Sequence, residues 1–71
     1  MKYIITEMQT DAEGVTAFLE DQKDNMYEAE SVYFTKLASA AISNVPLHTV
    51  VLMTNDGFQL DHKSYDHRSA D

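Results

Sequence analysis

The stretch NMYEAESVYFTKLASAAISNVP, residues 25–46, decides the fold because it predicts a long amphipathic helix. Asn25 followed three residues later by Glu28 matches a capping box, in which the two side chains satisfy amide groups at a helix start. Apolar side chains recur at the helical period and form one stripe: Met26, Ala29, Tyr33, Leu37, Ala40 and Ala41. This pattern predicts a helix that packs one side against another layer.

The end of this helix is marked by two residues. Asn44 suits a left-handed C-terminal cap, and Pro46 prevents the helix from continuing. We therefore expect the helix to run from about residue 26 to residue 43. Its small residues Ala38, Ala40 and Ala41 would let the backbone approach a sheet closely.

The residues before the helix predict a β-hairpin. Residues 3–8 are rich in β-branched and aromatic side chains, which is typical of a strand. Residues 11–14 form a turn, in which Gly14 can take the positive φ that closes a hairpin. Residues 15–19 alternate in a second strand, and the polar residues that follow are expected to end it.

The residues after the helix predict a second pair of strands. Residues 47–53 are apolar on both faces, residues 54–57 form a turn, and residues 58–65 alternate. Pairing Met53 with Phe58 would leave a four-residue loop. The predicted order is ββαββ, an α+β class with a four-stranded, largely antiparallel sheet and one helix on one face. We expect a single domain over residues 1–66 and a polar tail over residues 67–71.

One helix can cover only one face of such a sheet. The register with Met53 opposite Phe58 puts one apolar set on the face that burial favours: Leu47, Val51, Met53, Phe58 and Leu60. Phe18, Val50 and Leu52 then fall on the other face. A monomer would leave these side chains in water, which soluble monomers seldom do. We therefore expect a homodimer, sheet to sheet or edge to edge, with Phe18, Val50 and Leu52 in its interface.

Composition excludes several classes of function. The chain has 71 residues, a net charge of −7 and no cysteine, so disulfides, thiolate zinc sites and thiol nucleophiles are excluded. Direct binding to nucleic acid is not expected, because phosphate neutralisation needs a basic surface. No apolar run approaches the roughly 18 residues of a membrane span, and the first residues do not resemble a signal peptide. We expect a cytoplasmic protein without membrane contact.

Negative charge is concentrated in the first half of the chain. Residues 1–30 hold eight of the twelve acidic side chains and only two basic ones. Asp11, Glu13, Glu20 and Asp21 would form an acidic rim that attracts a basic protein partner. The alternative is that these carboxylates are ordinary solvated side chains.

Three histidines are candidate metal ligands. Asp61-His62 and Asp66-His67 repeat an acid–imidazole pair, and His48 lies on the neighbouring predicted strand. In the favoured register His48 faces Lys63 and points away from His62, whereas a one-residue shift would bring His48 and His62 to the same face. The spacing fits no known ligand pattern, so we expect no metal and no other cofactor.

No pattern in the sequence indicates catalysis. Glu30 falls within the apolar stripe of the helix, where a carboxylate can have a raised pKa and act as an acid or base. No histidine or nucleophile is placed beside it, and the serines lie in no nucleophile elbow. We therefore expect a protein that is not an enzyme.

Several short segments carry a resemblance to known sequences: Ala29-Glu30-Ser31 with Tyr33, residues 37–41 (LASAA), residues 43–48 (SNVPLH), Leu52-Met53, Asp56-Gly57 and residues 63–67 (KSYDH). The chain resembles a group of short open reading frames of gut anaerobic bacteria and their mobile elements and phages, which have no assigned activity. Those sequences often have histidine after the tyrosine, where this chain has Phe34. By analogy, the resemblance implies an accessory or anti-defence role.

Together these observations predict a small acidic, non-enzymatic protein-interaction module that modulates or inhibits a host defence protein. The alternative is a small ligand- or metal-binding protein that uses histidines at a dimer cleft, with converging polar groups in a concave site.

Overall fold

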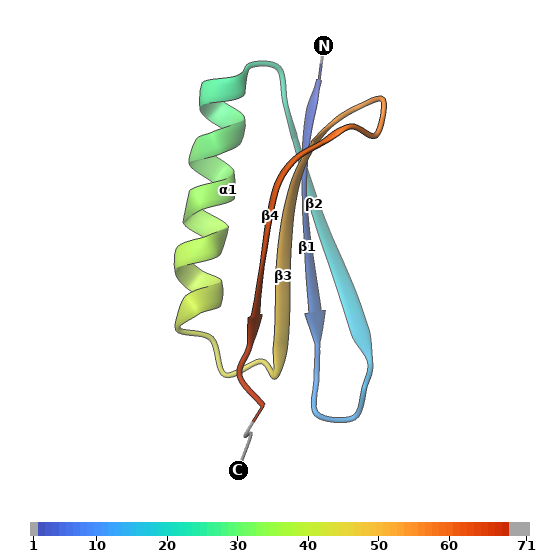
Figure 1. Cartoon of the computed structure of the whole chain (residues 1–71), viewed down its shortest axis with the longest axis vertical. Helices are drawn as coiled ribbons and strands as arrows, with labels where there is room; N and C mark the ends of the chain where they lie inside the picture. The colour runs from blue at the N-terminus through green and yellow to red at the C-terminus, as the bar shows by residue number, and fades with distance from the viewer. Residues whose placement is uncertain (1, 69–71) are drawn as a thin grey trace.

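The computed structural model describes residues 2–68, which form four strands and one helix (Figure 1). In chain order the elements are β1 (Tyr3–Thr10), β2 (Thr16–Lys23), α1 (Met26–Ala41), β3 (Leu47–Thr54) and β4 (Gln59–Asp66). The strands form one antiparallel sheet in the order β2-β1-β3-β4, and α1 lies along one face. The predicted α+β class, ββαββ order and antiparallel sheet are confirmed.

The two strands of the first hairpin are longer than predicted. β1 continues to Thr10, and β2 runs through the polar residues to Lys23, which pairs with Tyr3. Polar side chains did not end β2 because it is an edge strand whose residues remain exposed to water. Its ladder to β1 therefore needs no apolar side chains.

The helix begins as predicted and ends two residues earlier. The Asn25 side chain accepts a hydrogen bond from the backbone N–H of Glu28 at 2.8 Å, and the Asn25 amide donates to the Glu28 carboxylate at 2.6 Å. The predicted left-handed cap at Asn44 is wrong, since no residue other than glycine has a positive φ in the described chain. Ile42 caps the helix instead, and its N–H donates to the Ala40 carbonyl.

The core lies between α1 and the two central strands. Its fully buried apolar side chains come from β1, α1 and β3: Ile5, Ala29, Tyr33, Ala40, Val50 and Leu52. The prediction that Val50 and Leu52 lie on the face that the helix leaves uncovered is therefore wrong. Both residues face α1, so neither is available for a dimer interface. Phe18, by contrast, lies on the uncovered face and is 65% exposed.

β3 turns the other of its two alternating sets of side chains toward α1 than predicted, and this has a physical reason. Both sets of alternating side chains in β3 are apolar, so hydrophobicity alone did not distinguish them. The antiparallel register puts Leu52 opposite Ile5 and Val50 opposite Glu7, on the side that α1 covers. The other set, with Val51 and Met53, is only half-buried on the opposite side.

The turn between β3 and β4 also differs from the prediction. Met53 pairs with Gln59 rather than Phe58, and the register shifts by one residue between Leu52 and Met53. Phe58 is 66% exposed and Leu60 is 39% exposed, so neither is buried beneath the helix as predicted. The Thr54 N–H donates to the Phe58 carbonyl at 2.9 Å and closes the turn.

A matched pair of substitutions tests the orientation of β3. Val50→Asp should unfold the protein, because it puts an unpaired carboxylate in the core at a cost of more than about 4 kcal/mol. Val51→Asp should cost about 1 kcal/mol, because that side chain borders water. Thermal denaturation followed by circular dichroism measures both, and equal destabilisation would contradict the assigned orientation.

Candidate functional site

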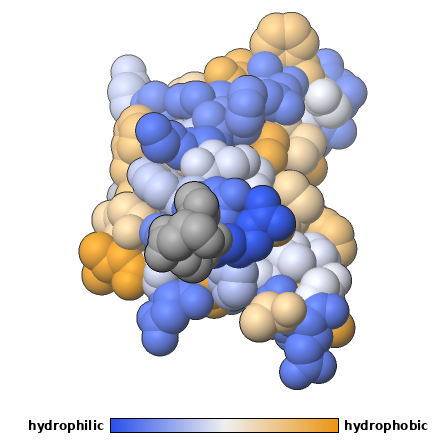
Figure 2. Space-filling model, turned by 60° about the horizontal axis from the view of Figure 1, so that its bottom comes forward, coloured by the Kyte–Doolittle hydropathy of each residue, from blue (hydrophilic) through white to orange (hydrophobic). Residues whose placement is uncertain are grey.

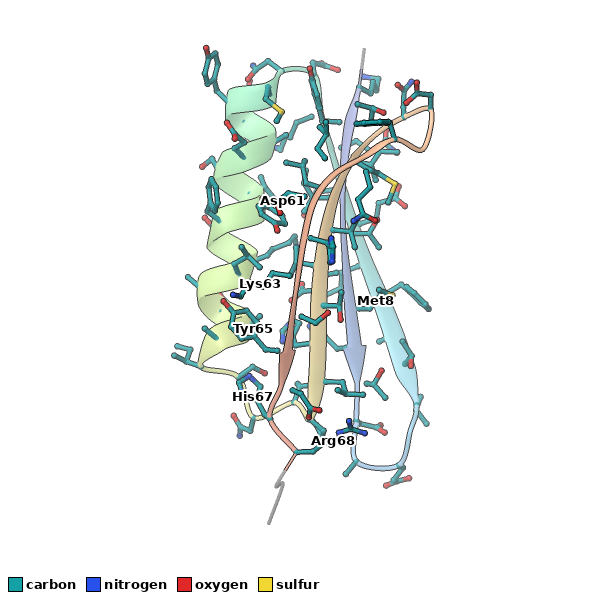
Figure 3. The ribbon with its side chains drawn as sticks, viewed as in Figure 1. Met8, Asp61, Lys63, Tyr65, His67 and Arg68 are labelled. Atoms are coloured by element: carbon teal, nitrogen blue, oxygen red, sulfur yellow. The ribbon has the colours of Figure 1, made fainter. Side chains whose placement is uncertain are left out.

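The single helix leaves the opposite face of the sheet open, and we call it the uncovered face. Its apolar side chains come from three strands: Ile4, Met8, Phe18, Leu47, Val51 and Met53. All are half-buried except Phe18, which is exposed. Met8 points away from the helix, whereas Asp61, Lys63 and Tyr65 of β4 point toward it (Figure 3).

Charge is distributed unequally between the two faces of the sheet. Glu20 and Asp66 project from the uncovered face, whereas Lys23 and Lys63 lie on the side that carries α1. Arg68 follows β4 and is paired with Asp66 at 2.8 Å. This pairing lowers the pKa of Asp66 to about 2, chiefly through the side-chain hydrogen bond from Arg68. The strands therefore contribute acidic but no lysine or arginine side chains to the uncovered face.

The four residues of the predicted acidic rim are all exposed but do not form one surface. Asp11 and Glu13 lie in the β1–β2 turn, where the Asp11 carboxylate accepts hydrogen bonds from the backbone N–H groups of Glu13 and Val15. Glu20 lies on the uncovered face, and Asp21 lies on the helix side of β2. Three of the four are thus placed at the turn or on the uncovered face.

A buried polar cluster beneath α1 was not predicted. Glu7 of β1 and His48 of β3 are both buried, and the imidazole Nε2 contacts the Glu7 carboxylate. His48 Nδ1 is buried without a hydrogen-bond partner in the described residues. Glu7 lies opposite Val50 and His48 lies opposite Gln9, so the two side chains are diagonal neighbours across the central strands.

Lys36 of α1 completes this cluster. Its Nζ lies 3.4 Å from the Glu7 carboxylate and 3.2 Å from that of Asp21. Burial alone would lower the pKa of Lys36, but its hydrogen bonds and charge interactions with Asp21 and Glu7 raise the pKa overall. The cluster joins the helix, the central strands and the edge strand, with Glu7 and His48 buried and Asp21 exposed at its border, so its evident role is structural.

The three histidines are held apart. His48 is buried beneath α1, while His62 lies on the uncovered face opposite Val51 and contacts Gln59. His67 hydrogen-bonds through Nε2 to the carbonyl of Ala40 at 2.8 Å. Within residues 2–68, no three histidine, aspartate or glutamate side chains are grouped as a metal site would require.

His67 also corrects the predicted domain boundary. Its backbone N–H donates to the Pro46 carbonyl at 2.7 Å, and its ring stacks on Tyr65 with centroids 6.0 Å apart. His67 is thus part of the folded domain rather than of a polar tail. The last three residues of the predicted tail lie outside the described residues.

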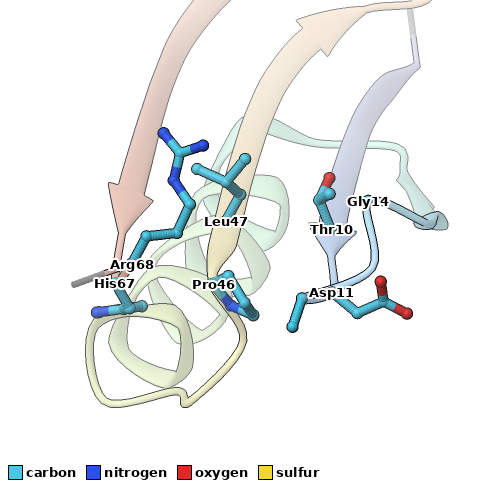
Figure 4. A pocket seen from close by; sticks show the side chains of 8 residues that line it. Thr10, Asp11, Gly14, Pro46, Leu47, His67 and Arg68 are labelled. Carbon is cyan, nitrogen blue, oxygen red and sulfur yellow. The ribbon is translucent and has the colours of Figure 1, made fainter. Parts of the chain in front are cut away.

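A shallow hollow of about 550 Å³ lies at the end of the sheet (Figure 4). Its lining residues come from the β1–β2 turn, the start of β3 and the segment after β4: Thr10, Asp11, Ala12, Gly14, Pro46, Leu47, His67 and Arg68. The polar groups of Asp11, His67 and Arg68 are already engaged by the contacts above. The surface around this end is mostly hydrophilic (Figure 2).

The chain matches no protein-family model, no curated protein and no solved structure. In the part of the chain that the structure describes, no helix has the length and apolar character that crossing a membrane requires. The geometry of the surfaces above therefore carries the functional argument.

Removing Glu7 alone should lower the free energy of unfolding more than removing Glu7 and His48 together. Glu7→Leu leaves His48 without its carboxylate and Lys36 with Asp21 alone, and should destabilise the fold by about 3–5 kcal/mol. Glu7→Leu with His48→Leu should recover part of that loss, because it replaces a buried polar pair with apolar volume. Urea denaturation gives these free energies. Asp24→Asn, which breaks the exposed Lys2–Asp24 pair, is the control and should leave the free energy of unfolding nearly unchanged, because solvent screens that pair.

Stability should fall at alkaline pH because of Tyr33. Burial, with the nearby charge of Asp61, raises the pKa of Tyr33 from 10.0 to about 12. The unfolded chain loses this proton at lower pH, so the contribution is complete below pH 10 and is lost as pH rises toward 12. The expected loss is roughly 2–3 kcal/mol. Tyr33→Phe should flatten this part of the stability profile, and an unchanged alkaline slope would contradict the assignment.

Proposed function

We propose that this protein is a non-enzymatic interaction module that binds a basic protein segment on its uncovered face. One observation carries the proposal: the strands present apolar and acidic side chains on this face and no lysine or arginine. Apolar area supplies affinity, while negative charge steers a partner of opposite sign.

The side chains of the uncovered face suit a protein partner better than a small ligand. Thr6, Thr49 and Ser64 lie between apolar residues, and the Thr49 and Ser64 hydroxyls bond each other at 2.9 Å. Met8 and Met53 are flexible and polarisable, so they can adapt to an irregular partner surface. A face of alternating apolar and hydroxyl side chains resembles the mixed composition of transient interfaces.

The charge of the protein favours a basic partner over an acidic one. The net charge is −7, and the ion pair between Arg68 and Asp66 adds no net charge beside this face. Asp11 and Glu13 add negative charge at the β1–β2 turn. Association with a positively charged segment is therefore accelerated by long-range attraction and weakened by salt.

A binding role is favoured over catalysis by the position of the acid–base groups. Glu7 and His48 form the closest carboxylate–imidazole contact of the described residues, yet both side chains are almost inaccessible to solvent. A substrate could reach them only if α1 moved. The histidines also do not converge, so no observation favours the alternative of a ligand- or metal-binding cleft.

The resemblance to short open reading frames of mobile elements suggests what such a module would do. An acidic protein that occupies a basic surface of a host defence protein would inhibit or modulate it by competition. The predicted cytoplasmic location belongs to this proposal, whereas the predicted homodimeric state is independent of it.

A comparison of variants in affinity capture tests the proposal. Immobilised protein should retain a basic protein from bacterial host lysate, and rising salt should release it, because counter-charges are screened. Met8→Lys should abolish retention, since it puts a bulky cation in the middle of the uncovered face. Mass spectrometry identifies what each column retains.

Phe34→Lys is the matched control, because Phe34 is an exposed aromatic residue on α1 and lies on no sheet face. This variant should retain the same basic protein as the unmodified chain. Retention by Met8→Lys at the level of the control, or retention of an acidic protein in place of a basic one, would contradict the proposal.

A further inference from the structure

The free edge of β2 is unusual because it exposes large apolar side chains on both faces of the sheet. Phe18 is 65% exposed on the uncovered face, and Leu19 is 49% exposed on the side of α1. Val15, just before the strand, is 62% exposed. Edge strands with exposed apolar side chains are the places where a further strand adds to a sheet.

The backbone of β2 offers hydrogen-bonding groups at this edge. The Asp11 N–H donates to the Val15 carbonyl, so Val15 and its odd-numbered successors direct their backbone groups toward β1. The even-numbered residues Thr16, Phe18 and Glu20 therefore direct their N–H and C=O groups outward. The hydroxyls of Thr10 and Thr16 lie 2.8 Å apart. This agrees with a pair that shares no backbone hydrogen bonds, because the side chains of such pairs lie closer together than those of hydrogen-bonded pairs.

The other edge of the sheet is protected against such pairing. β4 carries Asp61, Lys63 and Asp66, and its register to β3 is interrupted by a shift near the turn. Charged side chains and bulges are two devices that keep edge strands from pairing. β2 has its charges only in its second half and no register shift, so the two edges are not equivalent.

We propose that β2 pairs antiparallel with β2 of a second copy, with Phe18 opposite its own counterpart across a two-fold axis. The sheet then continues through both molecules, with both helices on the same side. Thr16, Phe18 and Glu20 of one copy meet Glu20, Phe18 and Thr16 of the other, all through outward backbone groups. The two Phe18 rings form a cross-strand aromatic pair, and Leu19 lies beside Ala17 of the other copy.

Charge selects this register over its neighbours. Centring the pairing on Glu20 or Asp21 would put like charges directly opposite each other, and centring it on Leu19 would put the two Glu20 carboxylates on a diagonal. With Phe18 at the centre, no acidic side chain of β2 lies opposite or diagonal to an acidic side chain of the other β2. Lys23 of each copy then lies level with Glu13 in the turn of the other.

This dimer goes beyond the binding of a basic segment and does not depend on it. The pairing uses the edge of the sheet and leaves the apolar centre of the uncovered face open in both copies. A dimer that binds no basic protein would refute only the proposed function. A monomer that binds one would refute only the dimer.

Charge complementation at residue 18 tests both the edge and the register. Light scattering coupled to gel filtration, over a concentration series to about 1 mM because small interfaces are weak, should give twice the 8.0 kDa chain mass. Higher salt should favour the dimer, since each copy carries −7. Phe18→Lys alone and Phe18→Glu alone should each be monomeric, because like charges oppose across the axis. An equimolar mixture of the two variants should restore the dimer.

Phe34→Lys is again the control and should keep the mass of the unmodified protein, since Phe34 is similarly exposed but lies on α1. Circular dichroism checks that each variant is folded. Because Phe18 is exposed, its substitution should leave the fold intact. A monomer mass for the unmodified protein, or a dimer of Phe18→Lys alone, would overturn the proposal. Complementation between Leu19→Lys and Leu19→Glu in place of the residue 18 pair would overturn the register.

Discussion

The close packing of α1 on the central strands is the constraint on which the rest of the structure depends. Ala29 and Ala40 are fully buried and bring the helix near Ile5, Val50 and Leu52. A helix with its side chains is about 10–12 Å wide and strands are spaced by about 4.8 Å, so one helix covers roughly two of the four strands. Because one helix is too narrow to cover four strands, the opposite face of the sheet and the edge of β2 remain exposed.

The buried cluster of Glu7, His48 and Lys36 limits how the central strands can pair. Ile5 and Glu7 lie on the same side of β1, so burying Ile5 beneath α1 also buries a carboxylate. If β3 were turned over, His48 would leave this side and Glu7 would lose its imidazole partner. Glu7 would then keep only Lys36, and the loss of one partner of a buried carboxylate is destabilising. The contact between Glu7 and His48 therefore disfavours the opposite orientation of β3.

The predictable part of the fold is the part that local pattern determines. The helix period, the cap formed by Asn25 and Glu28, and the glycine turns all depend on neighbouring residues, and each predicts that its element exists, although the end of the helix and the register of the second hairpin differ. The orientation of β3 was not predictable from hydrophobicity, because both of its faces are apolar. A signal was nevertheless present: Glu7 and His48 each interrupt an apolar alternating set in a separate strand, and such interruptions indicate a buried pair.

The candidate surfaces were only partly predictable for a similar reason. Phe18 was correctly expected on an open face, but Val50 and Leu52 were not separable from Val51 and Met53 by composition. The backbone groups that β2 exposes at its edge depend on the phase of its hydrogen bonds to β1, and this phase is determined by how Asp11 and Val15 close the turn. Side-chain pattern reports which residues share a face, whereas the outward backbone groups are known only once the pairing with β1 is established.

The size of the domain links its stability to association. A chain of about 70 residues buries only about 60% of the surface that it exposes when unfolded, and here eight large apolar side chains remain exposed within residues 2–68. Each partner that binds the folded state alone raises the free energy of unfolding by mass action. The proposed second copy at β2 and the proposed basic segment on the uncovered face would use different surfaces, so their stabilising effects would add. Exposed apolar area in this protein is thus both a deficit in its own core and the surface through which the proposed partners would stabilise it.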